Sequence, residues 1–259
     1  MRKYLYLCSV MRYFLELKYD GGAYCGWQIQ PDMPTIQQTI EAALTKLLRE
    51  PIEIVGAGRT DTGVNASYYV AHFDSTAELD TEQVMYKLNR MLPFDISIDS
   101  VTPVADGAHA RFDAREREYT YYISTRKCPF RRHSAWMYYV PLDVEKMNEA
   151  ARALTEYEDF TSFAKLNSNN KTNICHIMYA EWDWQESSVL RFRIRADRFL
   201  RNMVRSIVGT LVDVGRGRYS VEEFRAIVEA KDLSRSSAGA PAQGLFLSDV
   251  VYSKEVFDK

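Results

Sequence analysis

The sequence is poor in the patterns that hold metals or disulfides. It has four cysteines, Cys8, Cys25, Cys128 and Cys175, and no two of them form a C-x-x-C pair. Their wide spacing argues against a zinc ribbon and a disulfide framework, and it favours a reducing cytoplasm. The four histidines have no metal-ligand spacing either. We therefore expect no metal and no disulfide.

Long apolar runs are also missing from the start of the chain. The apolar stretch from Tyr4 to Val10 is too short to span a bilayer, and no small-residue cleavage site follows it. We expect no membrane anchor and no signal peptide. Residues 1–11 are interpreted as an N-terminal extension, or as a segment before an alternative start at Met11, because the first regular strand pattern begins there.

Three common cofactor and catalytic signatures are absent. The sequence contains no G-x-G-x-x-G, no P-loop and no G-x-S-x-G nucleophile elbow. We therefore expect chemistry that side chains carry by themselves, with no cofactor.

The net charge of −2 hides an uneven distribution of arginine. Residues 191–218 contain eight arginines but only two acids, Asp197 and Asp213. A second basic stretch comprises Arg111, Arg115, Arg117, Arg126, Lys127, Arg131 and Arg132. Such clustering is typical of a protein that binds a polyanion on one face. The alternative is that many of these arginines are solvated residues on strand edges.

Alternating strand and helix patterns predict an α+β fold. Tyr13 to Tyr19 alternate like a half-buried strand, and Thr35 can cap a helix with an apolar stripe from Ile36 to Leu48. Similar patterns recur in the second half. We expect two α+β subdomains with mixed or antiparallel sheets, residues 12–105 and 106–259. The strongest helical stripe starts at Leu200, and Arg201 and Arg205 share another face of that helix.

The segment V-G-A-G-R-T-D-T-G-V-N-A, residues 55–66, is the best candidate for chemistry. Its three glycines indicate a tight backbone that a substrate can approach closely. Asp61 is therefore the candidate catalytic carboxylate, and Arg59 supplies a neighbouring cation. The alternative is an aspartate that only caps a turn or pairs with Arg59.

Aromatic residues alternate with arginines in F-D-A-R-E-R-E-Y-T-Y-Y-I, residues 112–123. Tyr119 can stack on a flipped nucleobase while the arginines hold phosphates. An ordinary core aromatic is an equal alternative for Tyr119, and the core is the better interpretation for Trp27.

Several motifs together carry a family resemblance over residues 13–252. They are Y-D-G-G-A-Y-C-G-W-Q-I-Q, G-A-G-R-T-D-T-G-V-N-A, M-L-P-F-D-I-S-I, H-A-R-F-D-A-R-E-R-E-Y-T-Y-Y-I, F-L-R-N-M-V-R-S-I-V-G-T and A-P-A-Q-G-L-F-L-S-D-V-V-Y. In this order they resemble the tRNA pseudouridine synthase A family. The G-R-T-D-x-G-V block and the M-V-R-x-x-V-G helix are the most specific.

The resemblance implies a pseudouridine synthase fold with a central active-site cleft. It implies a cofactor-free enzyme that isomerises uridine to pseudouridine in the anticodon stem-loop, at tRNA positions 38–40. The family acts as a homodimer in which each tRNA touches both subunits. The matching positions imply Asp61 and Arg205 as catalytic residues and four substrate-binding residues, Arg59, Thr60, Tyr119 and Leu245.

Two positions depart from the family pattern. Asn65 replaces a histidine, which could alter RNA contacts near the pocket, and His176 stands where an arginine is common. Two other functions stay open. One is a non-catalytic RNA-binding module, which would tolerate loss of Asp61. The other is a nucleoside hydrolase, although such enzymes usually use two facing carboxylates.

Overall fold

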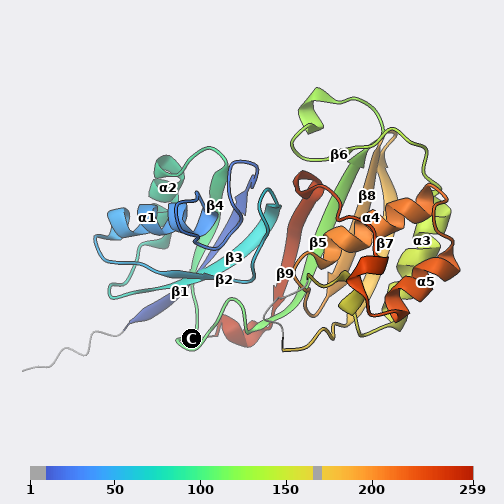
Figure 1. The fold of residues 1–259 in the computed structure, drawn as a ribbon. Coiled ribbons are helices and arrows are strands. Elements are labelled where there is room, and N and C mark those ends of the chain that lie inside the picture. Colours follow the sequence, from blue (N-terminus) through green and yellow to red (C-terminus); the bar gives the residue numbers. More distant parts are fainter. Residues whose placement is uncertain (1–9, 166–170, 259) are drawn as a thin grey trace, which may run out of the picture.

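The computed structural model describes residues 10–165 and 171–258, so Cys8 and most of the expected N-terminal extension lie outside it. The described chain forms a nine-stranded sheet with the order β4-β1-β3-β9-β5-β8-β7, in which β2 pairs with β3 and β6 with β5 (Figure 1). The strands are β1 (Met11–Tyr19), β2 (Ile54–Gly56), β3 (Asn65–Ser75), β4 (Ile96–Pro103), β5 (Ala114–Ser124), β6 (Trp136–Met137), β7 (Ile177–Glu186), β8 (Val189–Ala196) and β9 (Leu245–Tyr252). The α-helices are α1 (Ile36–Leu48), α2 (Thr81–Met91), α3 (Val144–Ala153), α4 (Met203–Gly215) and α5 (Val221–Glu229). Short 3-10 helices occur at Pro129–Arg131, Leu154–Glu156, Thr161–Phe163, Leu233–Arg235, Ala242–Gly244 and Lys254–Val256.

Helix starts in the first half follow from local capping. The Thr35 side chain accepts a hydrogen bond from the Gln38 N–H at the start of α1, and Asp80 caps α2 in the same way. Ile40 of α1 and Leu88 of α2 are fully buried in a core shared with β1, β3 and β4. Helix α1 begins where the sequence predicts.

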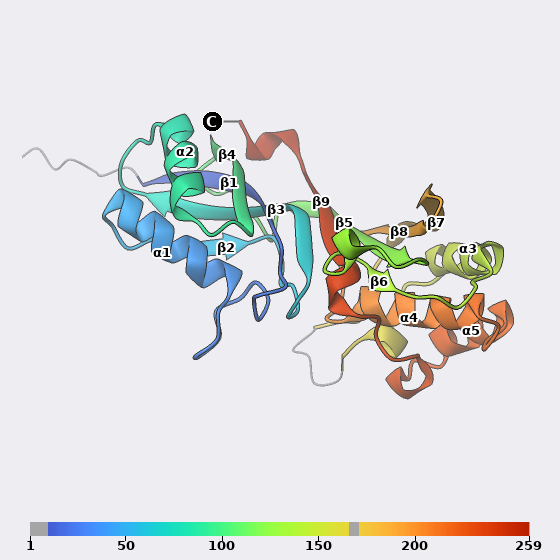
Figure 2. The ribbon, with the colours of Figure 1, turned by 90° about the horizontal axis from the view of Figure 1, so that it is seen from above.

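Helices cover one face of the sheet in the second half. Figure 2 shows α3, α4 and α5 on the same side of β5, β8 and β7. Phe192 and Ile194 of β8 are buried against these helices, whereas Arg191, Arg193 and Arg195 alternate with them and face the other side. The side chains of β8 therefore separate an apolar core from a charged outer face.

The two halves meet at a short parallel pairing between β3 and β9. It consists of two residue pairs, Asn65 with Phe246 and Ala66 with Leu247, and β9 continues as the antiparallel neighbour of β5. This seam makes the sheet mixed, and it joins the two sheets that the sequence predicts into one. The α+β class is confirmed. The division at residue 105 stays a prediction. Leu247 of the last strand packs into the core of the first half.

Two features differ from the sequence patterns. The strand β7 carries no prediction from the sequence, although Ala180, Trp182 and Trp184 alternate with acidic residues. Its pairing with β8 is irregular between Ile177 and Tyr179. The helix α4 begins at Met203 and not at Leu200. Asn202, directly before it, has a left-handed φ of 65° that ends the preceding turn.

Candidate active site

A cavity of about 460 Å³ lies where the two halves meet. The loop between β2 and β3 forms one wall, and residues 199–205 form the facing wall. All six residues that the sequence predicts for the site line this cavity: Arg59, Thr60, Asp61, Tyr119, Arg205 and Leu245. Eight further residues line the cavity and are not among the predicted site residues: Val64, Arg111, Phe199, Leu200, Arg201, Asn202, Met203 and Val204. The structure thus brings the six together, and their individual roles stay predictions.

Asp61 faces two guanidinium groups from the second half of the chain. Arg201 Nε donates a hydrogen bond to Asp61 Oδ1 at 3.4 Å, and Arg205 Nη1 lies 3.9 Å from Asp61 Oδ2. The Asp61 side chain is 27% exposed, so its carboxylate reaches the cavity. Coulombic attraction to both cations holds the carboxylate at this wall.

The two arginines are held differently. Arg205 Nε donates a hydrogen bond to the carbonyl oxygen of Ala240 at 2.7 Å, and its side chain is 23% exposed. The Arg201 side chain is 60% exposed. The sequence pattern placed Arg201 within a helix, whereas it lies in the turn before α4. Both arginines nevertheless face the same carboxylate, as the helix face that they were predicted to share suggests, although the resemblance pointed only to Arg205.

Tyr119 and Leu245 form an apolar part of the wall. Tyr119 comes from β5, and its ring packs edge to face on Phe199 with centroids 5.1 Å apart. Burial raises the pKa of Tyr119 to about 12, and Asp61 adds to this while Arg117 opposes it. The Tyr119 hydroxyl is therefore protonated at neutral pH. Leu245, at the start of β9, is buried.

A cluster of aromatic residues holds the Asp61 loop in place through hydrogen bonds. The Tyr19 hydroxyl and Thr60 Oγ1 are hydrogen-bonded at 2.9 Å, and the backbone N–H of Trp27 donates to the Thr60 carbonyl at 3.3 Å. Trp27 stacks on Tyr69 with ring centroids 4.1 Å apart, and the Tyr69 hydroxyl donates to the Gly58 carbonyl. Trp27 is 3% exposed, which confirms its prediction as a core residue.

Two of the three glycines in this loop are sterically required. A Cβ atom on Gly56 would lie 2.2 Å from the Tyr69 hydroxyl oxygen, and Gly63 has a φ of +76°. A Cβ atom on Gly58 would meet nothing within 4 Å. The expectation that all three glycines constrain the backbone is therefore wrong for Gly58.

Arg117 joins three segments around the cavity. Its Nη1 donates to the carbonyl oxygens of Ala114 at 2.8 Å and Asp197 at 3.0 Å. Its Nη2 donates to the carbonyl oxygens of Ala57 at 3.2 Å and Arg111 at 2.7 Å. Burial lowers the pKa of this guanidinium. Arg117 was assigned to a basic stretch, but its hydrogen bonds within the protein make it a support for the loops.

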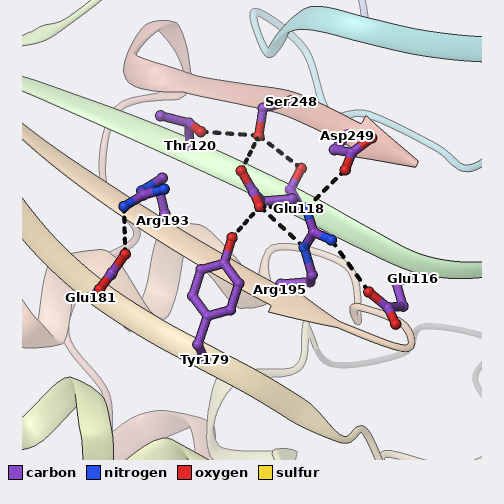
Figure 3. A network of polar contacts seen from close by, with 9 residues as sticks. All are labelled: Glu116, Glu118, Thr120, Tyr179, Glu181, Arg193, Arg195, Ser248 and Asp249. Atoms are coloured by element: carbon purple, nitrogen blue, oxygen red, sulfur yellow. Dashed lines mark hydrogen bonds and ion pairs between the residues drawn. The ribbon is translucent and has the colours of Figure 1, made fainter. Parts of the chain in front are cut away.

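Acidic residues neutralise the arginines on the outer face of β8. Figure 3 shows Arg195 between Glu118 and Asp249, each 2.8 Å from its Nη2, while Arg193 pairs with Glu181. Arg191 pairs with Asp183 in the same way, at 2.7 Å. The basic stretch at residues 191–218 is thus largely compensated along the strand. The strand β8 lies inside the sheet, between β5 and β7, and its arginines are held in ion pairs, so the solvated strand-edge alternative does not describe them either.

The cavity lining carries an excess of positive charge. It contains one acid, Asp61, and four arginines, Arg59, Arg111, Arg201 and Arg205. A cavity with this excess attracts an anionic ligand, and its limited opening strengthens the attraction. The polyanion interpretation therefore applies to this cavity and not to the whole basic stretch.

The two departures from the family pattern lie outside this cavity. Asn65 is 2% exposed; its Oδ1 accepts from the Gly21 N–H at 2.8 Å, and its Nδ2 donates to the Gln243 carbonyl at 2.9 Å. Both ends of its amide are occupied within the protein, and an effect of Asn65 on RNA contacts stays a prediction. His176 Nδ1 lies 3.7 Å from a carboxylate oxygen of Glu158, at an exposed position.

Metal and membrane features were sought in the described residues. Within residues 10–165 and 171–258, no three histidine, cysteine, aspartate or glutamate side chains gather as a metal site would require. In the same part of the chain, no helix has the length and apolar character needed to cross a membrane.

Comparisons with known proteins agree with the motifs. The family model described as tRNA pseudouridine synthase matches residues 17–113 and 150–253. Proteins named tRNA pseudouridine synthase A are similar over nearly their full length. The protein from Bacteroides fragilis is 53% identical, covering 96% of this chain and 100% of its own; that from Parabacteroides distasonis is 51% identical, covering 95% and 98%. The protein from Bacillus subtilis is 40% identical, covering 93% and 99%. The chain belongs to the tRNA pseudouridine synthase family.

Proposed function

We propose that this protein isomerises uridine to pseudouridine in the anticodon stem-loop of tRNA, with Asp61 as the catalytic carboxylate. One observation carries the proposal: the Asp61 side chain lies in a nucleoside-sized cavity between two guanidinium groups and an apolar wall that includes Tyr119. Family membership supports tRNA as the substrate class.

The reaction breaks the bond from ribose C1′ to uracil N1 and forms one from C1′ to C5. The hydrogen on C5 leaves as a proton, and N1 gains a proton. Positive charge develops on the ribose during cleavage, so an anionic carboxylate beside it stabilises the transition state. Asp61 can attack C1′ as a nucleophile or remove a proton from the sugar as a base. The overall change is redox-neutral, and the proposal includes no cofactor.

The remaining site residues have complementary roles in this proposal. Arg205 orients the Asp61 carboxylate from its anchored position on α4. Tyr119 and Leu245 pack on the uracil ring and keep the detached base from escaping before it rejoins the sugar. Arg59 contacts the RNA at the rim of the cavity, and Thr60 fixes the loop that carries Asp61.

Release of label from uridine C5 tests this function. With tRNA carrying tritium at uridine C5, we expect the unchanged protein to release tritium and Asp61→Asn to release none. Asp32→Asn is the matched control, because Asp32 is an exposed carboxylate whose left-handed φ of 58° suits asparagine. Free uracil in the products would instead indicate a hydrolase. Binding of tRNA with neither product would indicate an RNA-binding module.

Assembly and location form a second part of the proposal. We propose a cytoplasmic homodimer in which each tRNA contacts both subunits, as the family resemblance implies. Light scattering tests the dimer directly. Mixing Asp61→Asn with a variant defective only in tRNA binding tests the shared contact. If each tRNA contacts both subunits, a mixed dimer has one site that combines an intact Asp61 from one subunit with intact tRNA contacts from the other, and activity returns.

A further inference from the structure

Two smaller cavities adjoin the candidate active site at different walls. One, of about 390 Å³, shares Asp61, Arg201, Asn202 and Arg205 with the central cavity. The other, of about 210 Å³, shares Arg59 and Arg111 with it. The two side cavities have no lining residue in common. The three cavities therefore form a row with the Asp61 cavity in the middle.

Exposed arginines stand at both junctions of this row. At one junction Arg201 uses Nε to reach Asp61, and the described structure gives its two terminal nitrogens no partner. At the other, Arg59 and Arg111 are exposed and form no ion pair within the described residues. The Arg111 guanidinium only lies over the Phe112 ring, 5.8 Å from its centroid. Both junctions thus present guanidinium groups to solvent.

The side cavities also offer uncharged polar groups. The larger one is lined by Gln30, Thr62 and Cys25, and the smaller one by Gln28. Amide and hydroxyl groups can form hydrogen bonds to the base edges or ribose hydroxyls of a nucleotide. This lining suits an RNA segment better than it suits an isolated phosphate.

We propose that the three cavities form a track for three consecutive nucleotides of single-stranded RNA. This inference rests on the proposed function. A target uridine within a polynucleotide has a phosphodiester on each side, and placing its base in the central cavity brings these phosphodiesters to the junctions. Arg201 contacts one of them, Arg111 contacts the other with Arg59 beside it, and the neighbouring nucleotides occupy the side cavities.

Salt dependence of RNA binding tests the track. Binding of a five-nucleotide RNA with a central uridine is measured by fluorescence anisotropy over a range of salt concentrations. The protein carries Asp61→Asn throughout, so that no turnover occurs and Arg201 has no carboxylate to neutralise. Each phosphate contact to single-stranded RNA contributes about 0.7 to the slope of log Kd against log salt. We expect Arg201→Ala and Arg111→Ala each to lower the slope by about 0.7, and both together by about 1.4.

Two controls complete the test. Arg201→Lys keeps the charge and is expected to retain most of the slope. Arg90→Ala removes an exposed charge on α2, away from all three cavities, and is expected to leave the slope unchanged. The track is wrong if neither junction variant changes the slope, or if Arg90→Ala changes it equally. Tritium release by the unchanged protein separately reports on the proposed function, so the two failures can be told apart.

Discussion

Arg117 Nη2 donates a hydrogen bond to the carbonyl oxygen of Ala57, 3.2 Å away. This bond connects β5, a strand of the second half, to the loop that presents Asp61. The same guanidinium binds the carbonyl of Asp197, which lies just before the segment that carries Arg201. The Arg117 side chain thus connects the two walls of the cavity, the loop between β2 and β3 and the segment at residues 199–205. The distance between these walls sets the geometry at Asp61.

Replacement of Arg117 is expected to loosen both walls. Arg117→Lys keeps the charge but cannot donate to four carbonyls at once, and it leaves buried acceptors unpaired. We expect the free energy of unfolding to fall by about 2–3 kcal/mol, measured by urea denaturation. Arg115→Lys is the control on the same strand, since Arg115 is exposed and its single ion pair among the described residues is with Glu255. Equal effects of the two variants would contradict this role.

Arg205 is expected to act mainly on the chemical step. Its Nε is anchored to Ala240 and its Nη1 faces Asp61, so Arg205→Ala removes a fixed positive charge beside the carboxylate. We expect kcat for tritium release to fall about 100-fold, as is typical for loss of one preorganised electrostatic group. Arg225→Ala removes an exposed arginine that pairs with Glu156 on the helical side, and it should leave kcat unchanged.

The ring of Tyr119 is expected to matter more than its hydroxyl. Tyr119→Phe keeps the packing on Phe199, and we expect it to retain most activity. Because the pKa of Tyr119 is about 12, the two proteins should also share one pH–rate profile up to about pH 10. Tyr119→Ala should lose about 2–4 kcal/mol of stability and most of its turnover. Normal turnover in Tyr119→Ala would show that the reaction does not need the ring.

His72 is expected to make stability depend on pH. Burial, with contributions from Arg12 and His109, lowers the pKa of His72 from 6.5 to about 4. Between these values the unfolded chain binds a proton that the folded chain does not, so stability is complete above pH 6.5 and is lost as the pH falls towards 4. The loss is at most about 3 kcal/mol.

His72→Asn separates this titration from the hydrogen bond that the histidine makes. His72 Nδ1 accepts from the Ala110 N–H at 3.1 Å, and an asparagine oxygen can accept the same bond without titrating. We expect chemical denaturation between pH 4 and 6.5 to show a flatter dependence for His72→Asn. His133→Asn, at an exposed position, serves as the control. An unchanged slope in His72→Asn would show that other groups cause the dependence.

The sequence predicts local features of this fold well and long-range ones poorly. Thr35 and Asp80 cap their helices because a capping bond involves residues only three apart, which a pattern can reveal. The pairing of β3 with β9 joins residues about 180 positions apart, and alternation carries no information on such a partner. The joining of both halves into one sheet therefore became visible only in the structure.

The same distinction applies to the candidate site. Motif resemblance identified Asp61, Tyr119 and Arg205, which the structure places around one cavity. Arg201 was not predicted as a partner of Asp61, because the resemblance points only to Arg205, although helical spacing put the two arginines on one face. Arg117 was assigned to a phosphate-binding stretch, because charge is visible in a sequence and four distant carbonyl partners are not.

The position of β9 has a consequence for how the protein is made. The strand that completes the seam, and that brings Leu245 to the cavity, comes from residues 245–252, near the end of the chain. A ribosome emits these residues after all the others that line the cavity. The nascent polypeptide therefore holds Asp61 in an unfinished enclosure until residues 245–252 have been made, and RNA near the ribosome meets an assembled pocket only after that point.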